Sequence, residues 1–368
     1  MKKNQLILAV AVLAVLAALT MYEQHLHPFN FQMLIKQFQK ADWRKIALSA
    51  GCIYSAYAFR SVRWAQLLKH NKMVGPFSLL GTQVMGFTAV ALIGRVADPV
   101  RPYLVSRKTG LPLSSQIAVY IVERLFDAGS MALIFSVAML SVPYEEIVRV
   151  TSHSHLISLL GSHSPLLAAF AARYGGLVLT LLGALFLVTV RLAGNTVASM
   201  AEKSLGLLSK KFGTAVAEKI RAFHAGLDTM RTFGDFGITA GLSILMWLLI
   251  AAAYFEGIQA FSGSPELAAV TPSKCVLLMI ASGGASIFQL PVLGWFTQVG
   301  IVAAALTGLF GANAEAATAC SAILLLTTFL GIVPVGLVWA QLDHISLRKV
   351  TVESEHAEEK LEEDETSG

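Results

Sequence analysis

Long runs of apolar residues, separated by short charged loops, dominate this amino-acid sequence. The clearest run spans residues 117–142, and about 20 apolar residues in a helix are enough to cross a bilayer. Only 14% of the residues are charged and 55% are hydrophobic, whereas soluble domains carry about 25% charge. The pattern excludes a water-soluble enzyme domain. It predicts an all-α, polytopic integral membrane protein with about seven to nine membrane segments.

The first apolar run, residues 6–22, follows Lys2 and Lys3. This arrangement is typical either of a short first span or of the apolar core of a secretory signal. No small-residue cleavage site follows Tyr22, so we favour an uncleaved helix whose N-terminus lies in the cytoplasm.

The basic residues are concentrated in short loops. Outside residues 352–368 the chain has 27 basic and 15 acidic residues, and residues 60–72 hold four basic residues and no acid. Because Lys and Arg accumulate in cytoplasmic loops, we assign residues 60–72 and an amphipathic connection over residues 193–236 to the cytoplasm. The same bias places both termini on the cytoplasmic side of a bacterial inner membrane. Sidedness and anionic head groups explain the positive charge, so we expect no nucleic-acid partner.

The end of the chain differs from the rest in composition. Residues 352–368 contain eight of the 23 carboxylates, and a segment of this polarity cannot bury a core by itself. We therefore expect residues 1–345 to form one transmembrane domain and residues 346–368 to form an acidic, disordered cytoplasmic tail.

Glycine and proline break two of the membrane segments, residues 77–102 and residues 275–298. If the first segment crossed completely, the basic residues that follow it would lie outside, so we favour a re-entrant hairpin there. Broken segments in comparable places of two halves are typical of a transporter's inverted repeat. A kink for close helix packing explains the second break equally well.

Charged residues lie inside the clearest apolar run. Glu123 and Asp127 are four residues apart and share one helix face, whereas Arg124 points about 100° away. Each charge at the bilayer centre costs about 2.5–3.5 kcal/mol, so these groups need partners or water. We expect Arg95 and Arg101 to pair with the carboxylates, and the surplus of arginine to hold the phosphate of a lipid head group. Alternatively the carboxylates only fasten the broken segment, and the two roles can coexist.

The candidate residues of this lipid head-group pathway are Arg95, Asp98, Arg101, Glu123, Arg124 and Asp127. Weaker candidates are Arg63, Arg107, Gln289 and Gln298. A solvated, serine-rich outer loop, not a metal site, is the expected setting of His153, His155 and His163. No metal-like or paired spacing links Cys52, Cys275 and Cys320. The sequence shows no catalytic motif, and we expect no metal and no cofactor.

Three segments of the sequence carry a family resemblance: residues 94–103 (GRVADPVRPY), 107–110 (RKTG) and 122–127 (VERLFD). With them the chain resembles the lysylphosphatidylglycerol synthase transmembrane region family, also called flippase-like membrane proteins. The residues that match the family pattern are Arg95, Arg101, Glu123, Arg124 and Asp127. Residues 60–64 also resemble the family's basic-aromatic end of the second span. Ala97-Asp98 replaces the family's Gly-Glu, and residues 290–298 lack the acid that is usual at the later break.

The resemblance implies a function in lipid transport. In multiple peptide resistance factor proteins, a membrane region of this kind is associated with moving an aminoacylated phospholipid across the inner membrane, while a separate cytosolic domain makes that lipid. Only 27 residues follow Gln341, so the resemblance implies the translocase-like part and argues against lysyl transfer.

We therefore expect a non-enzymatic membrane protein that binds and translocates a phospholipid or a polyprenyl-linked lipid. One alternative is a non-catalytic membrane subunit that recruits a separate lipid synthase or glycosyltransferase through residues 193–236 or the acidic tail. A second alternative is an intramembrane lipid-modifying transferase that uses Glu123 or Asp127 as a base.

Overall fold

The computed structural model describes residues 29–145, 165–207, 209–227, 232–285 and 293–367. Most of these residues are helical, and no strand occurs among them, which confirms the all-α prediction. The longer helices are α3 (Trp43–Leu68), α4 (Pro76–Ile93), α6 (Leu113–Ser141), α9 (Pro165–Gly206), α10 (Lys210–Leu227), α11 (Phe233–Gln259), α13 (Pro272–Ala285), α14 (Leu293–Phe310), α15 (Ala314–Leu325), α16 (Ile332–Leu342) and α17 (Leu347–Ser367). The shorter pieces are α2 (Phe31–Lys40), η1 (Arg95–Ala97), α5 (Val100–Thr109), α12 (Pro265–Ala268) and η3 (Leu326–Leu330).

Three described stretches are long and apolar enough to cross a membrane: α4, α11 and the stretch Ala314–Leu342 formed by α15, η3 and α16. A bent pair within α9, Arg173–Gly183 and Val188–Gly206, adds a fourth if both pieces belong to one span. Helices α3 and α6, with 26 and 29 residues, also have the length of a span but carry charged residues. The protein is therefore a helical membrane protein, and a count of about seven to nine segments is compatible with these helices.

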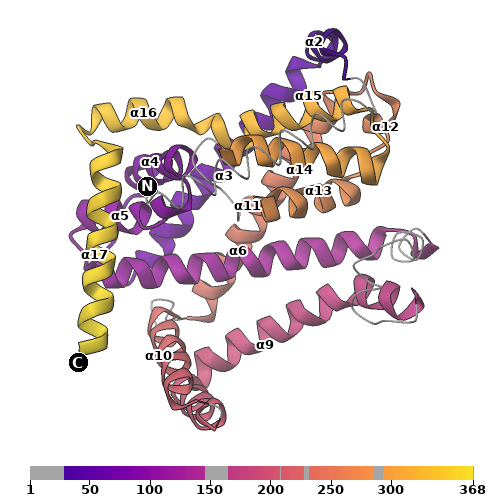
Figure 1. Ribbon diagram of the computed structural model, residues 1–368. Helices are drawn as coiled ribbons and strands as arrows, with labels where there is room; N and C mark the ends of the chain where they lie inside the picture. The colour runs from indigo at the N-terminus through magenta and orange to yellow at the C-terminus, as the bar shows by residue number, and fades with distance from the viewer. Residues whose placement is uncertain (1–28, 146–164, 208, 228–231, 286–292, 368) are drawn as a thin grey trace, which may run out of the picture.

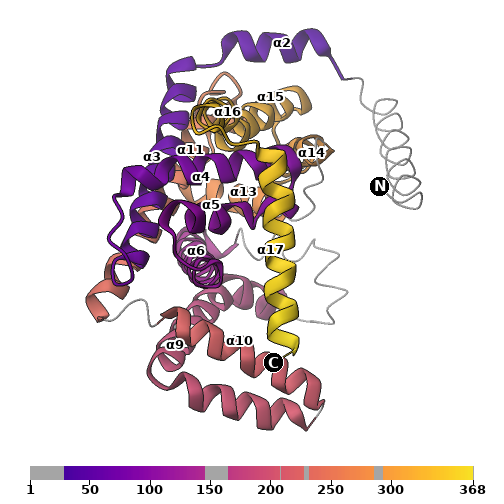
Figure 2. The same ribbon diagram turned by 90° about the vertical axis from the view of Figure 1, so that its left-hand side faces the viewer.

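Helices from distant parts of the sequence form the body of the molecule around α3. Helix α11 packs along α3, and α4 packs against both α3 and α16. Helix α6 lies beside α9, and α10 folds back along α9 (Figure 1). In the view turned by 90°, α17 runs past α4 and α5 toward the C-terminus (Figure 2). Helix α5 packs against α4 and α6, and α6 also contacts α3.

The first predicted break is a helical hairpin. Helix α4 ends at Gly94, which adopts φ 96° and ψ −169°, a conformation open essentially to glycine. The elements η1 and α5 follow and pack back against α4. Pro99 immediately precedes α5, a position where a missing backbone N–H costs little. The re-entrant placement of this hairpin in a membrane remains a prediction.

The second predicted break joins α13 and α14, which pack against each other. Residues 286–292, with the weaker candidate Gln289, lie outside the described residues. The first apolar run, residues 6–22, lies outside them too, as does the stretch that holds His153, His155 and His163.

The described part of the connection over residues 193–236 is largely helical, as expected. Helix α9 continues past a kink at Ala193, and α10 then packs along it. Helix α11 begins with a capping box in which the side chains of Thr232 and Asp235 each accept a hydrogen bond from the other's backbone N–H. The Asp235 carboxylate also lies 2.7 Å from Lys69 Nζ just beyond α3. The start of α11 is thereby fastened to the end of α3.

The expectation of a disordered C-terminal tail is wrong, because the tail forms helix α17. Leu347 and Val350 are buried in a hydrophobic cluster with residues of α4 and α5. The Tyr103 hydroxyl donates a hydrogen bond of 3.1 Å to Glu353 Oε2 on α17. Acidic composition alone misses the two apolar residues on one helix face, and Glu, Lys and Ala are good helix formers.

Candidate functional site

Arginines of α3 face carboxylates of α6. Arg60 and Arg63 are three residues apart and share a face of α3, and Glu123 and Asp127 share a face of α6 as predicted. Arg63 Nη2 lies 2.6 Å from Glu123 Oε1, and Arg63 Nη1 lies 2.6 Å from Asp127 Oδ1. Arg60 Nη1 lies 3.2 Å from Asp127 Oδ2. One guanidinium therefore bridges both carboxylates, and the second supports it from the preceding turn.

Helix α5 supplies a third arginine. Arg101 Nη2 donates a hydrogen bond of 2.6 Å to Glu123 Oε2. Its Nε and Nη2 atoms also donate to Gln83 Oε1 on α4, at 3.1 Å and 2.7 Å. The guanidinium carbon lies 4.4 Å from the centre of the Phe87 ring and 5.2 Å from that of Trp64, and aromatic faces stabilise a cation away from water. The predicted pairing of Arg101 with a carboxylate of α6 is confirmed.

The fourth arginine, Arg124, bends back over its own helix. Its Nη2 lies 2.9 Å from Asp127 Oδ2 and 3.5 Å from Glu123 Oε2. The expectation that Arg124 points away from these carboxylates describes its Cβ direction but not its guanidinium. The long, flexible side chain reaches Asp127, three residues further along the same helix, and its sequence neighbour Glu123.

These six side chains, the charge cluster, are Arg60, Arg63, Arg101, Glu123, Arg124 and Asp127. Five of the side chains are at most 8% exposed, and Arg124 is 34% exposed. Four guanidinium groups meet two carboxylates, which leaves a surplus of two positive charges. Because uncompensated buried charge costs several kcal/mol, the cluster favours a further anion beside it. The buried Nε atoms of Arg60, Arg63 and Arg124 also have no hydrogen-bond acceptor.

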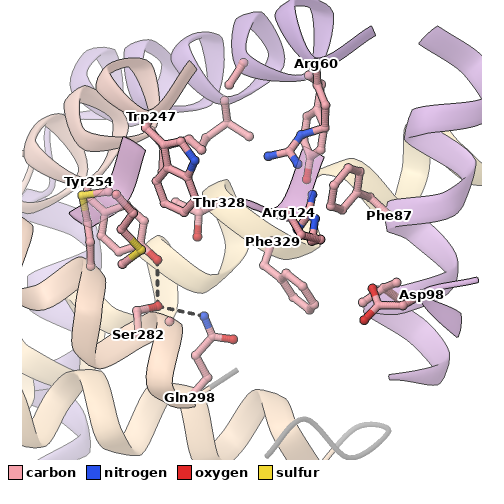
Figure 3. A pocket seen from close by; sticks show the side chains of 18 of the residues that line it. Arg60, Phe87, Asp98, Arg124, Trp247, Tyr254, Ser282, Gln298, Thr328 and Phe329 are labelled. Atoms are coloured by element: carbon pink, nitrogen blue, oxygen red, sulfur yellow. Dashed lines mark hydrogen bonds between the residues drawn. The ribbon is translucent and has the colours of Figure 1, made fainter. Parts of the chain in front are cut away.

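A cavity of about 230 Å³ lies next to the charge cluster. Arg60 and Arg124 line it, whereas the other members of the cluster are not among its lining residues. Figure 3 shows these two arginines on one side, near Phe87, with Phe329 closer to the middle. Side chains of α3, α4, α6, α11 and α13 add apolar surface to the lining. The cavity thus combines a cationic wall with surface that suits hydrocarbon.

The opposite wall is polar but uncharged. The Tyr254 hydroxyl and Ser282 Oγ lie 2.7 Å apart, and Gln298 Nε2 donates a hydrogen bond of 3.1 Å to Ser282 Oγ (Figure 3). These residues come from α11, α13 and α14, respectively. Above them Trp247 Nε1 donates to Asp127 Oδ1 at 3.3 Å and so connects this wall to the charge cluster.

The remaining predicted residues divide between the cavity and the surface. Arg95 and Asp98 both line the cavity and form an ion pair of 3.5 Å with each other. The prediction that Arg95 pairs with the carboxylates of α6 is therefore wrong, because Asp98 lies one turn away from it after the Gly94 break. Gln298 lines the cavity, whereas Arg107 lies outside it, 3.5 Å from Glu353.

Sequence reasoning missed part of the site. It assigned residues 60–72 to a loop, but α3 continues to Leu68 and buries both Arg60 and Arg63. The three-residue spacing of these arginines beside Trp64 was an available signal, since it places both on one helix face. Tyr254 and Ser282 offered no such signal, because each is a single polar residue within an apolar run.

The charge cluster contains the residues that carried the family resemblance in α5 and α6, and the full sequence supports that resemblance. The family model described as "Lysylphosphatidylglycerol synthase TM region" matches residues 6–337. The chain belongs to this family. No curated protein and no solved structure matches the chain significantly. In this member of the lysylphosphatidylglycerol synthase TM region family, four of the matching motif residues, Arg101, Glu123, Arg124 and Asp127, are joined by ion pairs, and Arg95 and Arg124 line the cavity beside them.

The described residues contain no group of three or more His, Cys, Asp or Glu side chains placed to hold a metal ion. All three cysteines are free thiols, and Cys275 and Cys320 are buried.

Proposed function

We propose that this protein binds the phosphate-bearing head group of a lipid in the cavity and moves that lipid across a bacterial inner membrane. The observation that carries the proposal is the surplus of two positive charges beside a partly apolar cavity in a membrane protein. Arginine's forked donors match the oxygen atoms of a phosphate, and a phospholipid or polyprenyl phosphate supplies that group together with apolar tails.

The head-group pathway has two tiers of residues. Arg60 and Arg124 line the cavity, so a phosphate bound there lies beside two guanidinium groups and offsets the surplus of positive charge. Behind them the Asp127 carboxylate holds both guanidinium groups in place by ion pairs. A positioned donor loses less conformational entropy on binding than a free surface arginine.

The ion pair between Arg95 and Asp98 is a part of the pathway that a bound phosphate can rearrange. Their side chains are 45% and 29% exposed, and a phosphate entering the cavity competes with Asp98 for the Arg95 guanidinium. Because they stand just after the Gly94 break, a change in this pair acts on the hinge of the α4–α5 hairpin. We propose that head-group exchange at this pair accompanies movement of the lipid.

We propose that residues 1–345 form one non-enzymatic transmembrane domain and that both termini lie in the cytoplasm. A phospholipid or a polyprenyl-linked lipid is the proposed partner. The cavity recognises this lipid by the charge and hydrogen bonding of its head group, not by its tails. The rival role of a subunit that recruits a lipid synthase or glycosyltransferase is an outcome of the test below.

Removal of Arg124 tests the proposal, because Asp127 keeps Arg60 and Arg63 as partners in that variant. Wild type, Arg124→Gln and the control Arg44→Gln are purified in mild detergent, and native mass spectrometry identifies the anionic lipids that remain bound. Arg44 is exposed at the start of α3 and serves as a matched loss of one positive charge. We expect Arg124→Gln to lower retention about tenfold or more, as for a hydrogen bond to a charged group.

Translocation is measured separately on proteoliposomes that carry a lipid with a fluorescent acyl chain, with a membrane-impermeant quencher outside. We expect wild type and Arg44→Gln to expose the inner-leaflet lipid and Arg124→Gln to do so more slowly. Equal retention in all three proteins, or no anionic lipid in any of them, would overturn the proposal. The second result would favour the recruiting subunit.

A further inference from the structure

The uncharged wall of the cavity contains one buried polar atom, Gln298 Oε1, that has no hydrogen-bond partner in the protein. Tyr254, Ser282 and Gln298 are 7%, 3% and 6% exposed, so water does not readily satisfy them. Gln298 Oε1 is buried and has no hydrogen-bond partner, and Gln298 lines the cavity. A buried polar atom without a partner costs free energy, and a ligand group that bonds to it recovers that cost.

The hydrogen-bond donors and acceptors of this wall determine which ligand group can bind to it. Tyr254 and Ser282 share one hydrogen bond, and Thr328 is a further hydrogen-bond partner of the Tyr254 hydroxyl. Ser282 Oγ also accepts from the Gln298 amide, which leaves the amide oxygen open. A ligand hydroxyl both donates and accepts, so it satisfies the Gln298 amide in either orientation of its oxygen and nitrogen.

The charges around the cavity discriminate against an amine. Among the described residues that line it, Asp98 carries the only carboxylate, and Arg95 already pairs with it. Arg60 and Arg124 give the lining further positive charge. An ammonium group in the cavity would meet like charges and no unpaired acid, and juxtaposed like charges are unfavourable.

We infer that the head group bound in this cavity carries uncharged hydroxyl groups next to its phosphate and no amine. This inference rests on the proposed lipid-binding function and specifies its ligand class. The phosphate lies at Arg60 and Arg124, and the hydroxyl-bearing part lies at Ser282 and Gln298. A cavity of about 230 Å³ is near the lower limit of small-molecule sites, so it holds the head group while the tails lie between the helices or in the bilayer.

Lipids of equal charge test the hydroxyl preference directly. Dioleoyl phosphatidylglycerol and dioleoyl phosphatidylpropanol each carry one negative charge and similar bulk, but only the first has hydroxyls beyond the phosphate. Dioleoyl phosphatidylethanolamine replaces the hydroxyls with an amine. Binding of each lipid to the full-length protein in detergent is titrated by native mass spectrometry. We expect phosphatidylglycerol to bind about tenfold more tightly than phosphatidylpropanol and phosphatidylethanolamine to bind most weakly.

The variant Gln298→Met keeps the side-chain length and removes the hydrogen-bonding amide. We expect it to weaken phosphatidylglycerol about tenfold and to leave phosphatidylpropanol unchanged, so the preference disappears. Gln39→Met, at an exposed position of α2, is the matched control and should keep the preference. A Gln298→Met protein that weakens both lipids equally would overturn the inference, because it would indicate a merely structural glutamine.

Two sources supply a hydroxylated phosphate head group, a glycerol and a sugar. A hexose-phosphate-linked polyprenol added to the same titration separates them, since tighter binding than phosphatidylglycerol supports the sugar and weaker binding supports glycerol. A preference for phosphatidylethanolamine overturns the inference. If no anionic lipid exceeds phosphatidylethanolamine and Arg124→Gln changes nothing, the proposed function itself fails. If Arg124→Gln still lowers binding but phosphatidylpropanol equals phosphatidylglycerol, only the hydroxyl inference fails.

Discussion

Replacing Glu123 with glutamine should destabilise this protein more than any other single change of a carboxylate to its amide. The Glu123 side chain is fully buried and lies 2.6 Å from both Arg63 and Arg101, with Arg60 and Arg124 at 3.6 Å and 3.5 Å. Glutamine has nearly the same volume but no charge, so four guanidinium groups would face one carboxylate. Removing one partner of a buried ion pair costs about 3–5 kcal/mol, because the other charge remains buried.

The buried cysteines provide the assay. Cys275 and Cys320 are free and buried, so a thiol-reactive fluorescent dye labels them as the fold opens on heating. We expect the midpoint of Glu123→Gln to fall by on the order of 10 °C. The control is Glu202→Gln, whose carboxylate is 39% exposed and forms a surface ion pair with Arg221. That change should cost about 1 kcal/mol or less.

A double variant checks the charge argument itself. Adding Arg101→Gln to Glu123→Gln removes one of the surplus positive charges, so the double variant should lose about 1–3 kcal/mol less than the two single losses together. If Glu123→Gln unfolds at the same temperature as Glu202→Gln, the charge cluster does not stabilise the fold. If the two single losses simply add, the surplus of positive charge is not what destabilises the variant.

Three further predictions concern the hairpin and the C-terminal helix. Gly94→Ala should lower the free energy of unfolding by about 1–3 kcal/mol, because Gly94 has a φ of 96°. Gly51→Ala should not destabilise the protein, because no atom lies within 4 Å of the added Cβ. The temperature midpoint of dye labelling measures both effects. The Cβ of Gly86→Ala would overlap the Arg101 side chain, so this variant should lose both stability and retained anionic lipid, and unchanged lipid retention would contradict it. Burial and, second, a hydrogen bond to Glu353 on α17 raise the pKa of the Tyr103 hydroxyl. The protonated phenol therefore stabilises the docking of α17 fully below pH about 10, the ordinary pKa of tyrosine. This stabilisation is lost as the pH rises through the higher pKa that Tyr103 has in the folded protein. A difference absorbance titration of wild type against Tyr103→Phe should place this phenol above the ordinary range, and an ordinary pKa would refute the contact.

The sequence predicted the helices, the α4–α5 break and the shared face of Glu123 and Asp127, but not the C-terminal helix. The apolar runs predicted the helices, because the cost of exposing backbone polar groups to lipid leaves few alternatives to a helix. Glycine and proline marked the α4–α5 hairpin, since Gly94 adopts a conformation that other residues avoid. The four-residue spacing predicted that Glu123 and Asp127 share a face, which the ion pairs confirm. The tail was misread because composition averages over residues, whereas docking of α17 depends on Leu347 and Val350.

Local sequence therefore determined which apolar segments are helical, where the chain breaks and which charges had to find partners inside the protein. It did not determine which partners they found. Arg60 and Arg63 reach the carboxylates because α3 crosses α6, and Tyr254, Ser282 and Gln298 meet because α11, α13 and α14 converge. Helical periodicity relates residues within about one turn of each other, whereas these contacts join residues 16 to 67 positions apart. Only the packing of the helices decides such pairs, and so only the tertiary structure assembled a cavity with one cationic and one uncharged polar wall.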